Sequence, residues 1–335
     1  MKMLLAISLT LIFSLSSGQT KKLYRKVEKT KDLTEKITLL SQIINLQPED
    51  LDAYFYRAIA KHDLGDYAGA IVDYSKIIVK EPDADTYLNR GNSRYSLGDY
   101  EGAKQDYIKA FKLDRNLIGA KYSLGCTKYD LGDFKGAFLD FNSIIQNYAY
   151  KHDFLYPKIF IYKSLLMRAL TYEALGNYIK AINDYSIIIS IKPNAENYYS
   201  RGKILMHIKL YKEAHADFTK SLSLNKNNAY AYFYRGASHL FLGKFLDAIS
   251  DLSEAVKFDS MDFDAYLGLA IAYNKVNDPN NARLNFEKAN AILSIGKNIK
   301  TIEQYRNTYW FQNQYFYFNN NVTKLVKLNK NQIFD

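Results

Sequence analysis

Residues that break or cross-link regular structure are scarce in this sequence. Among 335 residues there are one cysteine, five prolines and sixteen glycines. A single cysteine cannot form an internal disulfide, so the fold must be stabilised by packing. The low proline and glycine content excludes a collagen-like or loop-rich chain. An apolar content of 48% excludes a disordered polyelectrolyte.

Excess positive charge is absent from the main body of the chain. The formal net charge is +10, but residues 37–296 hold 31 basic and 30 acidic side chains. The excess lies in two flanks, residues 20–36 and 297–335. A nucleic-acid-binding surface concentrates positive charge where it meets phosphates. We therefore expect no nucleic-acid partner.

The apolar run near the start is too short to span a bilayer, which takes about 20 apolar residues. Lys2 precedes an apolar stretch from Met3 to Leu15, and small residues end it at 16–18. This order is typical of a cleavable secretory signal. We expect a signal peptide over residues 1–19, a mature chain with no transmembrane segment, and a periplasmic or secreted location.

Internal repetition is abundant. Turn signals such as Gly65-Asp66-Tyr67 and Gly98-Asp99-Tyr100 recur at steps of 33 or 34 residues, with one step of 44. Within each repeat, apolar and small residues follow helical spacing on both sides of the turn. The spacing predicts seven helical hairpins, which begin at residues 51, 84, 118, 162, 195, 229 and 263.

Three positions of the repeat have a constant character. Counted from the start of each repeat, position 8 is always Gly or Ala, and position 20 is always Ala. Position 24 is large, as in Tyr74 and Phe141. In an antiparallel hairpin the two small positions face each other, so the helix axes can approach closely. This period and pattern resemble the tetratricopeptide repeat family over about residues 51–296.

The resemblance implies an all-α fold: an α-solenoid, a right-handed superhelix of about seven hairpins with capping helices at both ends. Residues 20–50 are expected to form N-terminal capping helices or a degenerate repeat. Repeats 1–3 cover 51–146 and repeats 4–7 cover 162–296. The insertion 147–161 is interpreted as a spacer or bend, with a contact loop as the alternative. Residues 297–335 are expected to form a capping helix and an aromatic, basic tail, or else a docking patch.

Arginine at position 7 and aspartate at position 23 occur together in five repeats. Both positions are equally far from the turn, so the hairpin should place them at the same height. Because the combination recurs, we interpret it as structural ion pairs and not as catalytic dyads. The predicted pairs are Arg57/Asp73, Arg90/Asp106, Arg168/Asp184, Arg201/Asp217 and Arg235/Asp251.

One face of the first helix in each repeat is a candidate binding surface. Positions 2, 5, 9, 12 and 13 share one side of that helix. In the family this side is similar to the lining of a concave groove that holds peptide segments. Apolar and aromatic residues there favour hydrophobic anchors of a bound segment. The predicted groove residues are Phe55, Ile59, Leu88, Asn92, Tyr122, Tyr129, Leu166, Tyr199, Lys203, Phe233, Leu240 and Phe241.

Motifs of catalysis and of cofactor binding are missing. The five histidines include no i, i+4 pair, and Cys126 has no Cys or His at metal-ligand spacing. We expect no catalytic residue, metal or cofactor. The sequence predicts a non-catalytic scaffold that binds polypeptide segments in the cell envelope or outside the cell. The alternative is an accessory protein of glycan handling whose aromatic groove binds carbohydrate. Neither the partner nor the oligomeric state is indicated.

Overall fold

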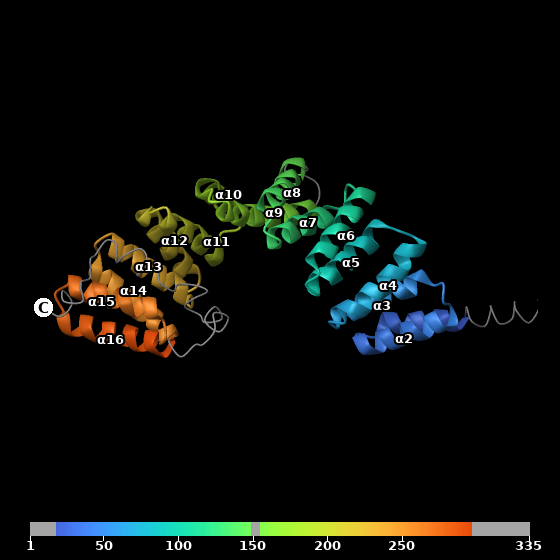
Figure 1. Cartoon of the computed structure of the whole chain (residues 1–335), viewed down its shortest axis with the longest axis horizontal. Coiled ribbons are helices and arrows are strands. Elements are labelled where there is room, and N and C mark those ends of the chain that lie inside the picture. The colour runs from blue at the N-terminus through green and yellow to red at the C-terminus, as the bar shows by residue number, and fades with distance from the viewer. Residues whose placement is uncertain (1–17, 149–154, 297–335) are drawn as a thin grey trace, which may run out of the picture. The chain divides into compact units, whose positions relative to one another are not determined.

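The computed structural model describes residues 18–148 and 155–296, and every regular element in these ranges is a helix (Figure 1). The predicted all-α fold is confirmed. The chain divides into two compact units, unit 1 ending at Leu175 and unit 2 beginning at Gly176. Most of the predicted signal peptide, the core of the insertion and the C-terminal segment 297–335 lie outside the described residues.

Unit 1 is a stack of consecutive helices. A helix over residues 18–29 is followed by α2 (Leu33–Leu46), α3 (Leu51–Asp63), α4 (Tyr67–Lys80), α5 (Ala84–Ser96), α6 (Tyr100–Leu113), α7 (Ile118–Asp130), α8 (Phe134–Tyr148) and α9 (Leu155–Ala174). The expected repeat starts 51, 84 and 118 are the first residues of α3, α5 and α7. Helix α9 begins before position 162, because the end of the insertion is itself helical.

Unit 2 continues the same pattern. Its helices are α10 (Tyr178–Ile191), α11 (Ala195–His207), α12 (Tyr211–Leu224), α13 (Ala229–Phe241), α14 (Phe245–Phe258), α15 (Phe263–Lys275) and α16 (Pro279–Gly296). The starts 195, 229 and 263 are the first residues of α11, α13 and α15. No described helix in either unit combines the length and the apolar content that a membrane span requires.

The turn inside each hairpin follows from two adjacent residues. Gly98 adopts φ +86°, a left-handed conformation that costs little without a Cβ. Asp99 then caps α6, since its carboxylate accepts a hydrogen bond from the Gly102 N–H at 2.9 Å. Two turns have no glycine: Lys209 (φ 66°) and Asn277 (φ 60°) take the left-handed position instead.

Close approach of the paired helices depends on the small residues. A Cβ added to Gly91 would lie 2.7 Å from a ring carbon of Tyr107, and one added to Gly125 would lie 2.7 Å from Phe141. The alanine at position 20 is fully buried in all seven repeats. Packing against a ring thus leaves no room for a side chain at these glycines. In the structure, position 8 packs directly against the large residue at position 24.

The N-terminal helices pack on the first hairpin of unit 1. Leu23 and Val27 of the helix over 18–29 join one hydrophobic cluster with Leu40 and Ile43 of α2 and Tyr54 of α3. Helix α2 is capped by Asp32, whose carboxylate accepts from the backbone N–H groups of the first turn. These two helices therefore cover the apolar side of repeat 1, as expected for the N-terminal end of a repeat array.

Candidate functional site

Four of the five expected arginine–aspartate pairs lie within a single unit, and all four are formed. In repeat 2 the Arg90 Nε and Nη2 atoms donate to the two carboxylate oxygens of Asp106 at 2.9 and 2.7 Å. The aspartates are buried, and the arginine side chains are 12–23% exposed. The other three pairs, with the same two-pronged contact, are Arg57/Asp73, Arg201/Asp217 and Arg235/Asp251.

These arginines also connect successive hairpins. The Arg90 Nη1 atom donates to the Ser75 hydroxyl of the preceding repeat at 3.0 Å, and Arg201 does the same to Ser186. The Arg90 guanidinium also lies 5.5 Å from the ring centre of Tyr87, at position 4. Arg90 and Arg201 therefore each satisfy a buried carboxylate and contact the preceding repeat. These contacts give the two side chains a structural role.

A second cation at position 11 was not anticipated from the sequence. Lys61 Nζ lies 2.8 Å from Asp73, and Arg94 Nη1 lies 2.9 Å from Asp106. Repeat 3 has no arginine at position 7, and there Lys128 pairs with Asp140 at 2.6 Å. The pairing of positions 7 and 11 with 23 thus explains why Asp140 persists without its expected arginine.

The fifth expected pair, Arg168/Asp184, is divided between the two units. Arg168 belongs to α9 of unit 1, where its Nη1 atom donates to the Asn142 side-chain oxygen at 2.6 Å. Asp184 belongs to α10 of unit 2 and is 3% exposed. This pair stays a prediction.

The first-helix face, meaning positions 2, 5, 9, 12 and 13 of each first helix, remains accessible over much of the chain. Ten of the twelve predicted groove residues are half-buried: Phe55, Ile59, Leu88, Asn92, Tyr122, Tyr129, Leu166, Tyr199, Lys203 and Phe241. Several of them pack sideways on rings of their own repeat. Phe241 stacks on Tyr211 with ring centres 4.3 Å apart, and Tyr122 lies 5.9 Å from Phe141.

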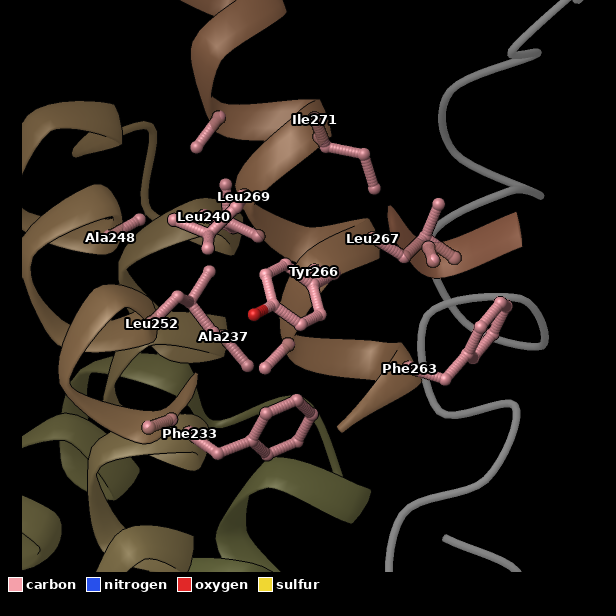
Figure 2. Close-up of a cluster of buried hydrophobic side chains, with 14 of the residues drawn as sticks. Phe233, Ala237, Leu240, Ala248, Leu252, Phe263, Tyr266, Leu267, Leu269 and Ile271 are labelled. Carbon is pink, nitrogen blue, oxygen red and sulfur yellow. The ribbon is translucent and has the colours of Figure 1, made fainter. Parts of the chain in front are cut away.

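Two predicted groove residues belong to the core of unit 2 instead. Phe233 is fully buried and Leu240 is 8% exposed. Figure 2 shows Phe233 beside Ala237 and Leu252, in one cluster with Leu240 and Tyr266. Their large apolar side chains are enclosed by α13, α14 and α15, so they are not available to a partner. The predicted groove is therefore corrected at these two positions.

The first-helix face of unit 1 contains a hollow of about 350 Å³. Helices α3, α5 and α7 of three successive repeats contribute most of its lining, and α6 contributes Tyr107. The residues of this unit-1 hollow are His62, Asn92, Tyr95, Ser96, Tyr107, Tyr122, Ser123 and Cys126. Because consecutive first helices lie side by side, residues 30 or more positions apart in sequence meet in one site.

Hydrogen bonds fix the polar groups of the unit-1 hollow. The Tyr107 hydroxyl donates to the Asn92 side-chain oxygen at 2.9 Å. The two amide N–H donors of Asn92 have no acceptor among the described residues. The Tyr95 hydroxyl donates to Asp130 at the edge of the hollow. The site therefore offers rings, hydroxyls and one free amide.

The lining has no reactive nucleophile at neutral pH. Burial raises the pKa of the Cys126 thiol to about 11, so it stays protonated. Burial likewise raises the pKa of Tyr107 and of Tyr122, and for Tyr95 the hydrogen bond to Asp130 adds to the effect of burial on the pKa. Among the described residues, no group of three or more His, Cys, Asp or Glu side chains is arranged to hold a metal ion.

Carboxylates lie along the first-helix face of unit 1. Asp52, Asp63, Asp85 and Asp130 are exposed and Glu173 is half-buried, all at positions of the first-helix face. None of the five forms an ion pair with another described residue, and the face holds one lysine in this unit, Lys163. The first-helix face of unit 1 is therefore acidic around a neutral, aromatic hollow.

Six of the eight hollow residues occupy the five face positions, and two of these, Asn92 and Tyr122, were predicted as groove residues. Tyr107 was assigned to the core because it occupies position 24, and its ring is indeed 2% exposed. Its hydroxyl nevertheless reaches the hollow. Ser96 occupies face position 13 as a small polar residue, whereas Ser123 lies at position 6, outside the five face positions. Only the side-by-side packing of three first helices brings them together.

Four segments of the chain match the tetratricopeptide repeat family: residues 52–84, 84–117, 162–194 and 195–228. They coincide with repeats 1, 2, 4 and 5. Together with the hairpins described above, these matches show that the chain contains tetratricopeptide repeats. Its fold is the all-α solenoid of such proteins.

Curated relatives are much longer than the matched region. Tetratricopeptide repeat protein 13 of Homo sapiens is 38% identical over 107 residues, which are 32% of this chain and 12% of that protein. Serine/threonine-protein phosphatase 5 of Homo sapiens is 33% identical over 104 residues, covering 31% of this chain and 21% of that protein. The chain thus spans a small part of the length of these relatives.

Two solved structures share the fold over 77% of this chain. One is a tetratricopeptide repeat protein of Parabacteroides merdae, with a TM-score of 0.53, 19% identity and 98% of that chain covered. The other is the C-terminal part of a repeat-containing protein of Cytophaga hutchinsonii, with a TM-score of 0.60, 17% identity and 99% covered. At this identity the likeness concerns the fold alone.

Proposed function

We propose that this chain is a non-catalytic scaffold whose first-helix face binds segments of other polypeptides. Tetratricopeptide repeats generally mediate protein–protein interactions, and the chain contains them in series. The observation that carries the proposal is the unit-1 hollow, where three repeats enclose about 350 Å³. A surface built from several repeats suits an extended ligand, because each repeat contributes one contact along it.

The described residues also support a non-catalytic role. The buried arginines and aspartates are used by the packing of the hairpins. Cys126 is held in its protonated form by burial, which raises its pKa. The accessible first-helix face is mainly apolar, aromatic or carboxylate, with lysines and histidines at a few positions: Lys163, Lys203, Lys275, His62 and His207. Such a surface provides binding energy for a polypeptide segment.

We further propose that the scaffold acts in the cell envelope or outside the cell. This part rests on the sequence of residues 1–19, which has the charged start, apolar stretch and small-residue exit of a secretory signal. Fractionation of the native host, with an antibody against the repeats, tests it. Recovery in the cytoplasm with residues 1–19 still attached would contradict this part alone.

The binding function is tested by affinity capture with matched variants. Leu88→Lys places a charge on the first-helix face at a half-buried position. Leu246→Lys makes the same change on α14, where the side chain is 73% exposed on the opposite helix of its hairpin. A polypeptide that binds the face should be captured by the wild type and by Leu246→Lys, and lost with Leu88→Lys.

Two results would contradict the proposal. One is a partner that both variants retain equally, which would place binding elsewhere. The other is strong binding on a glycan array without any polypeptide partner, which would favour carbohydrate as the ligand. Circular dichroism of both variants establishes that the helices are intact before binding is compared.

A further inference from the structure

The acidic border of the unit-1 hollow indicates the charge of its ligand. Asp63 follows His62 directly in sequence, and Asp130 accepts the hydrogen bond of Tyr95, so two carboxylates adjoin the lining. Asp52 and Asp85 extend the negative charge to the other end of α3 and α5. Unpaired charges of one sign attract a ligand of the opposite sign and exclude ligands of the same sign.

The two units differ in the charge of their first-helix face. In unit 2 the same face holds two lysines, Lys203 and Lys275, beside Glu196 and Asp264. Lys203 also lies 5.5 Å from the ring centre of Tyr199. The excess of carboxylates is thus a property of the unit-1 face and not of the repeat in general. A ligand selected by charge should bind unit 1.

The lining of the hollow indicates which side chain enters it. Tyr95 and Tyr122 present two rings, and Tyr107 contributes its hydroxyl. Rings gain from edge-to-face contact beyond the area they bury. A volume of about 350 Å³ lies at the lower end of the range for ligand pockets, which suits one side chain. An aliphatic group alone would bury the free amide donors of Asn92 without an acceptor, which is unfavourable.

We propose that the unit-1 hollow receives an aromatic side chain from a basic segment of a separate protein, with lysines or arginines of that segment paired to Asp63 and Asp130. This inference rests on the proposed function and specifies its partner. The oxygen acceptor for Asn92 is a tyrosine hydroxyl or a peptide carbonyl of the same segment. The carboxylates at Asp52 and Asp85 extend the contact along the segment.

The experiment begins with short random peptides displayed on phage and selected on the full chain. Selected peptides should carry an aromatic residue beside Lys or Arg. Their affinity, measured by fluorescence anisotropy with synthetic copies, should weaken as ionic strength rises from about 0.01 M to about 0.15 M. A consensus that is acidic, or aliphatic without an aromatic residue, would overturn the proposal. So would the absence of any selected peptide.

Two variants locate the binding. Ser96→Trp fills the hollow from an exposed position, and Asp63→Asn with Asp130→Asn removes charge without changing shape. Each should weaken binding by about tenfold. The control is Glu213→Gln with Glu287→Gln, which removes the same two charges from exposed positions on α12 and α16. It should leave affinity unchanged. Equal affinity in all three proteins would overturn the proposal.

A synthetic peptide of residues 303–330 separates the two possible sources of the ligand. That segment combines aromatic residues with Arg306 and Lys324. If it binds the hollow more tightly than the selected peptides, the occupant is a second copy of this chain, and the assignment to a separate protein is overturned. If a captured partner depends on Leu88 but not on Ser96 or Asp63, the proposed function stands and this inference fails.

Discussion

The Arg90 guanidinium holds the buried carboxylate of Asp106 by two hydrogen bonds, of 2.9 and 2.7 Å, and donates a third to Ser75 of the preceding repeat. A single side chain thereby closes one hairpin and attaches it to its neighbour. The same geometry recurs at Arg201, with Asp217 and Ser186. The repeat array is therefore joined by polar contacts as well as by apolar packing.

Loss of the position-7 arginine should lower the free energy of unfolding most where no second cation pairs with the aspartate. Asp106 is also bound by Arg94, whereas Asp217 is paired with Arg201 alone among the described residues. We expect Arg201→Leu to lower the free energy of unfolding by about 3 kcal/mol, because it leaves a buried charge uncompensated. Arg90→Leu should lower the free energy of unfolding clearly less, because Arg94 still pairs with Asp106.

Urea denaturation of both variants, and of Asp217→Leu with and without Arg201→Leu, measures the effect. The double variant should be less destabilised than the sum of the two single changes. Additive losses would show that the contact seen in the structure does not stabilise the hairpin. Equal losses for Arg90→Leu and Arg201→Leu would show that Arg94 does not compensate for the lost arginine.

The helix approach at Gly125 should not tolerate a branched side chain. A Cβ there would lie 2.7 Å from a ring carbon of Phe141, which is fully buried. We expect Gly125→Val to destabilise the protein by about 1–3 kcal/mol through overpacking. Leucine has a smaller side chain than phenylalanine, so Phe141→Leu should relieve part of the overpacking.

Thermal and urea unfolding of Gly125→Val, Phe141→Leu and the combined variant test this. The combined variant should be more stable than the two separate losses predict. If Phe141→Leu does not reduce the effect of Gly125→Val at all, the clash is not the cause.

The turn at Lys209 should be improved by glycine. Lys209 adopts φ 66°, a conformation that costs an L-residue about 1–2 kcal/mol relative to glycine. Part of this difference is offset because glycine loses more conformational entropy on folding. Lys209→Gly should therefore raise the free energy of unfolding by about 1 kcal/mol. Gly98→Lys, at φ 86°, is the matched reverse change and should lower it. Urea unfolding of the two variants should show opposite signs.

Acid should weaken unit 2 through two neighbouring histidines. The rings of His215 and His239 lie 4.5 Å apart, and the buried Nδ1 of His239 has no hydrogen-bond partner. Burial lowers the pKa of both, and for His239 the neighbouring His215 lowers the pKa further. The surrounding charges are Arg235 and Lys244, which lower the pKa of His215, and Asp247 and Asp251, which raise the pKa of both histidines.

Because the folded state has the lower histidine pKa, the unfolded state binds more protons in acid. The stability that the neutral pair contributes is present above the unfolded value, about pH 6.5, and falls as the pH drops below it. We expect the free energy of unfolding to fall less steeply with acid in His215→Gln with His239→Gln than in the wild type. NMR titration giving a pKa above 6.5 for either ring would contradict this.

The repeat period predicts which residues share a height but not how deeply each is enclosed. Positions 7 and 23 are equidistant from the turn, and four arginine–aspartate pairs follow from that count alone. The same count places Phe233 on the first-helix face, yet it is fully buried by its neighbours in unit 2. How deeply a side chain is buried depends on the side chains that adjacent helices place around it, and the sequence of one repeat does not specify these.

Contacts between repeats were the least predictable part. The serines that receive the third arginine hydrogen bond lie on the preceding repeat, and Lys128 replaces an arginine from one helical turn away. The unit-1 hollow is assembled from four helices, so no single sequence motif predicts it. Only the hollow residues at the five face positions, such as Asn92 and Tyr95, could be predicted from the sequence.

The central claim is that polypeptides bind the first-helix face, and site-specific photo-cross-linking tests it most directly. A photoreactive phenylalanine analogue is placed at Leu88 or Tyr199 on that face, and at Val72 or Leu246 on the second helices, where the side chains are 67% and 73% exposed. With bound partner present, the first two positions should form covalent adducts with the polypeptide and the last two should not. Adducts from Val72 and Leu246, with none from Leu88 and Tyr199, would contradict the claim.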